Sequence, residues 1–304
     1  MKSIKVVALR KFVLCISSVL LLLGISFFVF RGFNLGIDFE SGVSDTIRIG
    51  RSGVRIEEIR SALSDISARV QRQGQESDST FIIRTFAADD DEKTSREGQI
   101  VSALGNVFGE SNVQVISSSF IGAKFSSSLI TTSLVAIAVA LIGILVYIWL
   151  RFQFSFSIAS ILTLIHDVMI LLSFIVVFRI EISSITIAAI LTIIGYSINN
   201  TIVIFDRIKE NIKAGGSKDL DAIVDLSINQ SITRTLFSSL TTLAVVIPMG
   251  IIVLNNDIRM FSLVLSVGIC IGIYSSTFVC ANILRALSLS KKRLLDPMTI
   301  AEVK

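Results

Sequence analysis

Six long apolar runs are the feature that most constrains this chain. An α-helix needs about 20 apolar residues to cross ~30 Å of hydrocarbon. The sequence is 52% hydrophobic and only 17% charged, which is too little charge to cover a soluble fold. We therefore predict an all-α membrane bundle of six spans, at about residues 12–30, 128–150, 156–178, 183–205, 235–254 and 259–284. No small-residue cleavage site follows the first span, so it is expected to be an uncleaved anchor.

Basic residues in the short connections indicate the orientation of the spans. They gather at the N-terminus, in the loop 206–234 and near the C-terminus. An even number of spans places these regions on one side, and the positive-inside rule makes that side the cytoplasm. The sequence thus predicts a multi-pass protein in a lipid bilayer, with cytoplasmic N- and C-termini. The basic residues form no single stripe, so nucleic acid is not an expected partner.

The predicted order of parts follows from the spacing of the spans. It runs from an N-terminal tail and first span to a polar outer domain, a five-helix bundle and a cytoplasmic tail, at 1–30, 31–127, 128–286 and 287–304. The bundle contains the cytoplasmic loop 206–234, in which helical spacing predicts an amphipathic helix on the membrane surface. Its apolar positions are Leu220, Ile223, Val224, Leu226, Ile228 and Ile232.

The outer segment 31–127 is predicted to be a small α+β domain. Apolar, β-branched stretches indicate three strands, at 45–49, 81–86 and 113–121. Apolar side chains at helical spacing indicate two helices, at 55–71 and 99–108. The alternation of strands and helices favours a ferredoxin-like sheet covered on one face.

Polar side chains inside the spans are the candidate functional residues, because they are costly in a membrane. The third span carries His166, the only histidine, beside Asp167. Adjacent helical residues point about 100° apart, so the two are not expected to face one partner. Asp167 either holds helices together by hydrogen bonds or takes part in ion movement. We leave both interpretations open.

The fourth and fifth spans add a second group of polar residues. Asn199 and Asn200 interrupt the fourth span, and Arg234 begins the fifth from the same side. Asn200 and Arg234 are therefore expected at similar depth, where the arginine either pairs with a neighbour or extends to the interface. Asp206 and Arg207 close the fourth span.

Several classes of chemistry lack their signatures in this sequence. It has no Gly-x-x-x-x-Gly-Lys-Ser/Thr motif for ATP, and its single histidine lies in mid-membrane, away from any nucleophile set. The three cysteines all lie in apolar runs, which argues against disulfides and thiolate metal sites. We therefore expect a protein that is not an enzyme, has no cofactor, and draws any energy from an ion gradient.

Five segments together resemble the SecF family of protein-export subunits, over nearly the whole chain. Residues 195–211, which begin with Gly195 and include Asp206 and Arg207, resemble its most distinctive motif. The segment 36–42, with Asp38, is similar to its first motif. The others are His166 with Asp167, and the segments 234–236 and 272–276.

The resemblance implies a fold, partners and a mechanism. The bundle would belong to the resistance-nodulation-division class. The protein would lie in the bacterial inner membrane with SecD, the SecYEG channel and, in many cases, YajC. The pair would use the proton gradient, or sodium in some bacteria, to help exported polypeptides finish crossing. Asp38 would shape the junction between the first span and the outer domain.

The sequence departs from the family pattern at three places. Asn200 stands where the family carries an aspartate credited with proton handling, whose proposed partner matches Arg234. Asparagine does not titrate. Coupling then rests on SecD, or involves Asp167, or this half is structural. Ala123 replaces a proline after Gly122, and Glu40 and Ser41 alter the first motif.

Two other functions remain as alternatives. A passive scaffold for SecD would need no ion site, and Asn200 favours that interpretation. An ion-driven small-molecule exporter of the same class would have two six-span halves and two large outer domains, which this chain lacks. We predict that Asp167, Asn199, Asn200 and Arg234 form the functional polar cluster.

Overall fold

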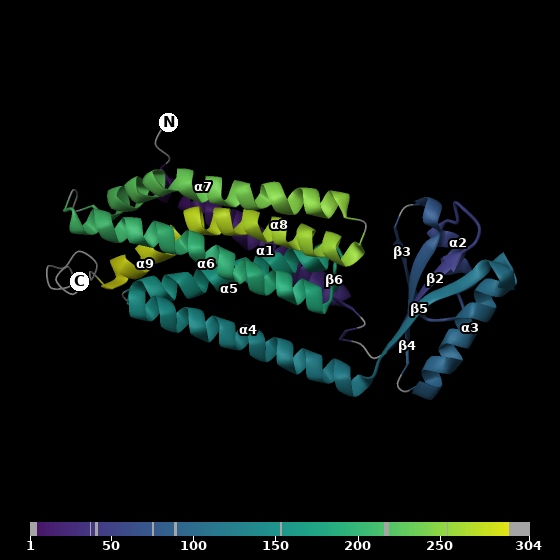
Figure 1. Ribbon diagram of the computed structural model, residues 1–304. Coiled ribbons are helices and arrows are strands. Elements are labelled where there is room, and N and C mark those ends of the chain that lie inside the picture. Colours follow the sequence, from purple (N-terminus) through teal and green to yellow (C-terminus); the bar gives the residue numbers. More distant parts are fainter. Residues whose placement is uncertain are drawn as a thin grey trace.

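The chain folds into a membrane bundle and a separate sheet domain at one end of it (Figure 1). The computed structural model describes residues 5–36, 38–39, 42–74, 76–87, 90–152, 154–215, 219–253 and 255–291. Glu40 and Ser41, singled out in the first motif, lie outside the described residues.

Six helices long and apolar enough to cross a membrane occur in the described part of the chain, in the predicted order. After a short 3-10 turn, η1 (Val7–Leu9), they are α1 (Arg10–Arg31), α4 (Ala123–Arg151), α5 (Phe154–Val177), α6 (Ser184–Lys213), α7 (Leu220–Ile252) and α8 (Asn256–Tyr274). The sixth span continues beyond Tyr274 as a π-helical segment, η4 (Ser275–Cys280), and then as α9 (Ala281–Lys291). We had not predicted the π-helical segment.

The fifth helix begins much earlier than predicted. It starts at Leu220 with Asp219 as its N-cap, whose side chain accepts a hydrogen bond from the backbone of Asp221. The segment predicted as a separate surface helix is therefore the first part of α7. Its apolar side chains, including Ile223, Val224 and Ile228, are buried in the main core instead of lying in the interface. A helix packed inside the bundle and a helix lying in the membrane interface both require apolar residues at helical spacing. The spacing alone therefore did not distinguish the two.

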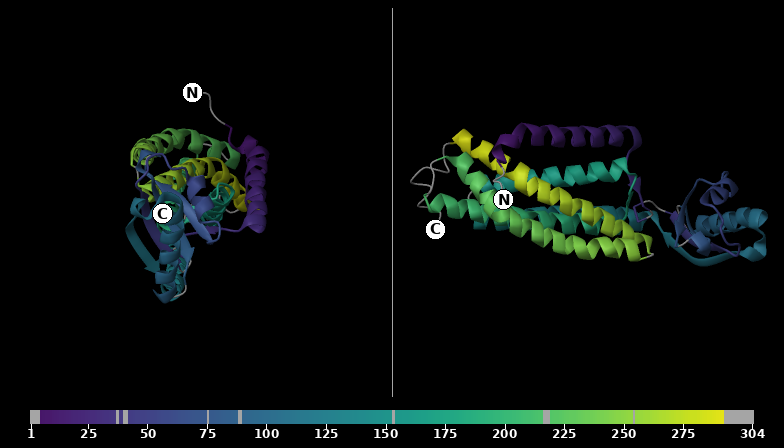
Figure 2. Two further views of the ribbon diagram at one scale, coloured as in Figure 1. Left: turned by 90° about the vertical axis from the view of Figure 1, so that its right-hand side faces the viewer. Right: turned by 90° about the horizontal axis from the view of Figure 1, so that it is seen from above.

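The core of the bundle lies between α5, α6 and α8. In the most apolar stretch of the sixth span, Asp257–Leu287, 56% of the residues are buried, whereas that of α4 has no buried residues. Figure 2 shows α1 along one edge of the bundle. It packs closely on α5, because a Cβ at Gly24 would lie 1.9 Å from the Oγ of Ser173. The exposed apolar side chains of α1 and α4 suit contact with lipid.

The segment predicted to lie outside the membrane, for which we keep the name outer domain, is a four-stranded antiparallel sheet with α2 and α3 on one face. Its strands lie in the order β3-β4-β2-β5, and the elements follow as β2 (Gly42–Ile49), α2 (Ile56–Ala62), β3 (Ala68–Gln73), β4 (Thr80–Phe86), α3 (Asp90–Phe108) and β5 (Val113–Ile121). Short 3-10 turns, η2 (Glu76–Asp78) and η3 (Glu110–Asn112), precede β4 and β5. The core includes Ile47, Ile59, Phe81, Ile83, Ile100 and Leu104.

The three predicted strands are confirmed, but the first predicted helix was too long. The helix expected over 55–71 ends at Ala62, and Ala68–Gln73 forms β3 instead. Val70 pairs with Ile83 of β4 and faces the core. A buried apolar residue at this position is equally consistent with a helix and with a strand. The segment forms a strand because its backbone hydrogen-bonds to β4, and the spacing of apolar residues in the sequence does not predict that pairing.

A short parallel strand pair joins the sheet domain to the bundle. It consists of β1 (Asn34–Leu35) and β6 (Glu181–Ile182), which we had not predicted. Arg84 of β4 forms an ion pair with Glu181, and Arg69 of β3 donates to the carbonyl of Leu35 at 2.6 Å. These contacts position the sheet at one end of the bundle, beside the end of α1, the end of α5 and the start of α6.

Candidate functional site

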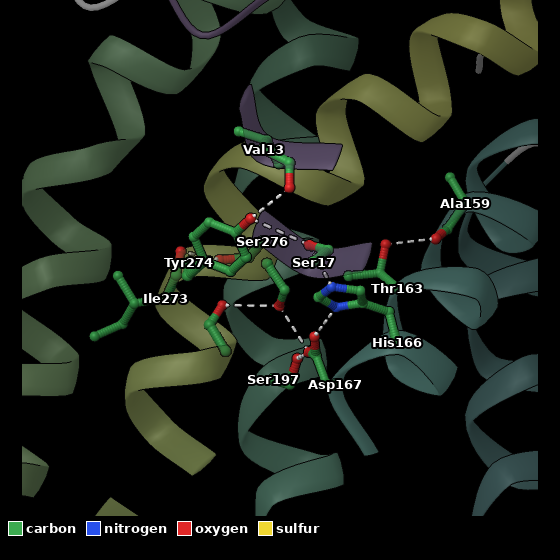
Figure 3. Close-up of polar contacts among 12 residues, drawn as sticks. Val13, Ser17, Ala159, Thr163, His166, Asp167, Ser197, Ile273, Tyr274 and Ser276 are labelled. Carbon is green, nitrogen blue, oxygen red and sulfur yellow. Dashed lines mark hydrogen bonds and ion pairs between the residues drawn. The ribbon is translucent and has the colours of Figure 1, made fainter. Parts of the chain in front are cut away.

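The carboxylate of Asp167 lies buried in the middle of the bundle, with 1% of the residue exposed. Its Oδ2 accepts hydrogen bonds from the Oγ of Ser197 on α6 at 2.5 Å and from that of Ser275 at 2.7 Å. Ser275 begins the π-helical segment of the sixth span. Asp167 therefore joins three spans through one oxygen atom (Figure 3).

His166 occupies the other side of the same carboxylate. Its Nδ1 lies 3.0 Å from the Oδ1 of Asp167, and its Nε2 lies 2.9 Å from the Oγ of Ser17 on α1. As the 100° angle between adjacent helical residues predicts, the two side chains have different partners on other helices. Asp167 contacts α6 and the sixth span, while His166 contacts α1. The two side chains nevertheless contact each other directly, which the angle alone did not indicate.

Tyr274 extends the network along the edge of the bundle. Its hydroxyl lies 3.1 Å from the Oγ of Ser17 and donates to the carbonyl of Val13 at 3.0 Å. Figure 3 shows the resulting line of polar atoms from the carboxylate to the backbone of α1. Sequence reasoning missed Ser17, which carries no signal, and included Tyr274 and Ser275 only within the motif segment 272–276.

The polypeptide builds this site from small residues and a local change of helix type. Gly268 lets α8 approach α6 closely, because a Cβ there would lie 2.2 Å from the Cδ1 of Ile193, and Gly272 lies beside Ser197 one turn further along. The π-helical segment then starts at Ser275, and such segments are frequent at functional sites. A widened turn changes which side chains face inward, so Tyr274 and Ser275 both reach the network.

Two hydroxyl donors and one ring nitrogen surround the carboxylate of Asp167. In the described part of the chain, neither arginine nor lysine forms an ion pair with it. His166 is thus the side chain that can supply a neighbouring positive charge. No cluster of three or more metal-binding side chains occurs among the described residues.

The structure separates the four residues of the predicted polar cluster. Asn200 is buried at 1% exposure, one helical turn beyond Ser197, and its Nδ2 has no hydrogen-bond partner within the described residues. Asn199 and Arg234 are exposed on the outside of the bundle. Asp167 and Asn200 therefore belong to the interior, whereas Asn199 and Arg234 face away from it.

The other motif residues lie at the two ends of the bundle. Asp206 pairs with Arg151 at 3.3 Å, and Arg207 donates to Gln230 at 2.7 Å, both near the α6–α7 connection. At the outer end, the Oδ2 of Asp38 accepts from the backbone N–H of Ser184 at 2.8 Å, in the first turn of α6. Gly195 is exposed, and a Cβ there would meet nothing within 4 Å.

The fold and this site define a helical membrane protein with six candidate spans among the described residues, an ionisable site in the middle of the bundle, and a sheet domain at one end of it. The family described as protein export membrane protein SecD/SecF, C-terminal, matches residues 100–290, and the SecD/SecF GG motif matches residues 26–44. The chain belongs to the SecD/SecF protein-export family.

Individual relatives agree with this assignment. The protein translocase subunit SecF of Borreliella burgdorferi is 38% identical over 92% of this chain and 95% of its own length. The protein translocase subunit SecDF of Brucella abortus is 36% identical over 86% of this chain but only 34% of its own length. These relatives are named as protein translocase subunits, and the chain has a role in protein export.

A solved structure shares the fold. The crystal structure of SecDF from Thermus thermophilus, described as a translocon-associated membrane protein, superimposes with a TM-score of 0.79 at 32% identity. The match covers 94% of this chain and 38% of that one. This chain thus corresponds to one part of a longer protein in that organism.

Proposed function

We propose that this chain acts with SecD to use the proton gradient, or a sodium gradient, to promote late steps of protein translocation across the bacterial inner membrane. One observation carries the proposal: the carboxylate of Asp167 is buried in mid-bundle, where it accepts from hydroxyls on α6 and the sixth span and contacts the ring of His166 on α5. A buried ionisable group between helices is what ion-driven membrane proteins use.

The exposed polar residues support a partner within the membrane. Arg234 lies 14 residues after the start of α7 at Leu220, so it sits well inside the helix and is exposed on its outer face. A guanidinium in lipid is costly, and a partner carboxylate would offset that cost. SecDF of Brucella abortus, which joins both names in one chain, favours SecD as that partner. We propose that SecD completes the polar cluster at Arg234 and Asn199.

The remaining expectations are part of the same proposal. The complex would associate with SecYEG and, in many bacteria, YajC, and would act on exported polypeptides, with both termini of this chain cytoplasmic. The bundle would have the resistance-nodulation-division architecture. The outer domain would be ferredoxin-like, which the sheet order β3-β4-β2-β5 and its antiparallel pairing support. The predicted part boundaries at 30, 127 and 286 remain proposals.

A passive scaffold for SecD is the alternative that Asn200 favours, since this amide does not titrate. The small-molecule exporter has no feature of the described residues in its favour. The scaffold and the coupled subunit differ in one respect: only the second needs the carboxylate of Asp167.

Export kinetics test this difference. Cells whose only copy carries Asp167→Asn or Arg234→Met should release a secreted protein from the membrane at least several-fold more slowly, at unchanged protein level. SecD binding should be unchanged in Asp167→Asn and weaker in Arg234→Met, which removes the proposed contact. Asp65→Asn, which removes an exposed carboxylate on the outer domain, is the matched control and should release at the normal rate. Normal release in the first two variants would establish the scaffold instead.

A further inference from the structure

Four consecutive polar contacts run from Asp167 to the backbone of α1. They join the Oδ1 of Asp167 to Nδ1 of His166, Nε2 of His166 to Ser17, Ser17 to Tyr274, and Tyr274 to the carbonyl of Val13, at 3.0, 2.9, 3.1 and 3.0 Å. Each contact between two electronegative atoms at this distance needs one hydrogen between them.

The direction of every hydrogen bond follows from the last contact. A carbonyl only accepts, so Tyr274 donates its single hydrogen to Val13. Ser17 must then donate to Tyr274, and the Nε2 of His166 must donate to Ser17. The contact between Nδ1 and Asp167 needs a hydrogen of its own. The network therefore requires four hydrogens.

A neutral imidazole beside an ionised carboxylate supplies one hydrogen too few. His166, Ser17 and Tyr274 would contribute one each, which makes three for four contacts. Ser197 and Ser275 cannot make up the difference, because their hydrogens point to the other oxygen, Oδ2 of Asp167. The observed geometry thus matches a state that holds one additional proton.

We propose that His166 and Asp167 together bind one transferable proton, and that this pair is the titrating site of the chain in place of Asn200. The inference rests on the proposed function and deepens it, because it names the proton as the coupling ion. On loading, a proton from water binds Nε2 and gives an imidazolium beside the carboxylate. On release, the proton returns to water, Ser17 turns its hydrogen to Nε2, and the Ser17–Tyr274 contact loses its hydrogen.

The surroundings of the pair suit a single exchangeable charge. Among the described residues, the titratable side chains that face it are Tyr274 and Cys280, both on the sixth span. The other packed helices present Ser17 from α1 and Ser197 from α6, which do not titrate. Neither lysine nor arginine of the described residues pairs with Asp167. The imidazolium of His166 is accordingly the charge that balances the carboxylate.

Nitrogen NMR on the single histidine tests the proposal directly. Full-length protein labelled with 15N-histidine, purified through a histidine-free tag and placed in phospholipid vesicles, gives signals from His166 alone. At neutral pH we expect both ring nitrogens to be protonated, with loss of the second proton as the pH is raised. A single protonated nitrogen at every pH from about 5 to 9 would overturn the proposal, since that window brackets the ordinary histidine titration.

The variant Tyr274→Phe separates the hydrogen count from a merely structural role. Without the tyrosine hydroxyl, two contacts remain and neutral His166 with Ser17 supplies both hydrogens. The pH midpoint should therefore fall by about one unit, the equivalent of one hydrogen bond. Ser276→Ala, next to Ser275 but bonded only to the carbonyl of Ile273, should leave it unchanged. An unchanged midpoint in Tyr274→Phe would overturn the count.

Removal of the carboxylate gives a second arm. Asp167→Asn should leave His166 neutral over the same pH range, and a persisting imidazolium would contradict the shared site. The NMR readout needs no export, so the two proposals fail separately. A titrating pair in a protein whose export ignores Asp167 would refute the proposed function alone, whereas a silent pair with export that needs Asp167 would refute the proton site alone.

Discussion

The hydroxyl of Ser275 donates to the carboxylate of Asp167 across 2.7 Å, although the two residues are 108 positions apart in the sequence. The contact exists because the sixth span changes to a π-helix at Ser275. The contact joins the sixth span to the third span in the middle of the bundle. A change in the charge of Asp167 therefore alters a hydrogen bond that holds the sixth span in place.

Removal of that hydroxyl should weaken both packing and function. Ser275→Ala leaves a buried carboxylate with one donor fewer, which we expect to cost about 1–2 kcal/mol in the free energy of unfolding. Thermal denaturation in detergent measures the loss. Ser276→Ala removes a neighbouring hydroxyl that bonds only within its own helix, and it should lie close to wild type. Equal losses in the two variants would contradict a special role for the Asp167 contact.

The close approach of α1 to α5 depends on Gly24. A Cβ at this position would lie 1.9 Å from the Oγ and 2.8 Å from the Cα of Ser173, and a change of rotamer cannot move the Cα. Gly24→Ala should therefore destabilise the protein by about 1–3 kcal/mol through overpacking and move Ser17 away from His166. Gly143→Ala on α4, where a Cβ meets nothing within 4 Å, is the matched control. Thermal unfolding compares them, and a tolerated Gly24→Ala would show that the helices separate easily.

A buried carboxyl group in the outer domain should make the stability of that domain depend on pH. Burial raises the pKa of Asp45 above its usual 3.8, and nearby Glu97 adds to the effect, while Ser118 and Lys93 oppose it. Because the folded-state pKa is the higher one, stability is greatest in acid and falls as the pH rises through it. Asp45→Asn should remove this loss and stabilise the domain at neutral pH.

Amide hydrogen exchange of β2 and its neighbours in the whole protein, measured across pH, checks the prediction for Asp45. Asp65→Asn, which alters an exposed carboxylate of the same domain, is the control and should leave the pH dependence as it is. A domain that becomes more stable as the pH rises would contradict the sign of the effect.

The ion pair between Arg84 and Glu181 should couple the outer domain to the bundle. Both side chains are largely shielded, at 17% and 24% exposure. A double-mutant cycle with Arg84→Met and Glu181→Gln should give a coupling energy of about 1–2 kcal/mol in thermal unfolding. The pair of Arg96 with Glu92 on α3, at 35% and 34% exposure, should give about 0.5 kcal/mol or less. Similar values for the two cycles would show that the junction pair adds nothing.

Local patterns were sufficient for the spans and for the three predicted strands. Apolar runs of membrane length have one stable solution in lipid, a helix, so their number and order were predictable. The same patterns failed at Val70, because its spacing suits a helix and a strand alike. Pairing with Ile83 decided the matter, and that partner lies elsewhere in the chain. The start of α7 was wrong for a similar reason, since burial against the core and exposure at an interface require the same periodicity.

The sequence by itself determined which residues are costly in the membrane, and so directed attention to Asp167, His166 and Asn200. Only the tertiary structure decided which of them meet. Hydrogen bonds act over about 3 Å, whereas Ser17, His166 and Tyr274 lie on three different helices. Helix packing and the π-helical turn bring those atoms within reach of one another, and neither leaves a periodic trace in the sequence.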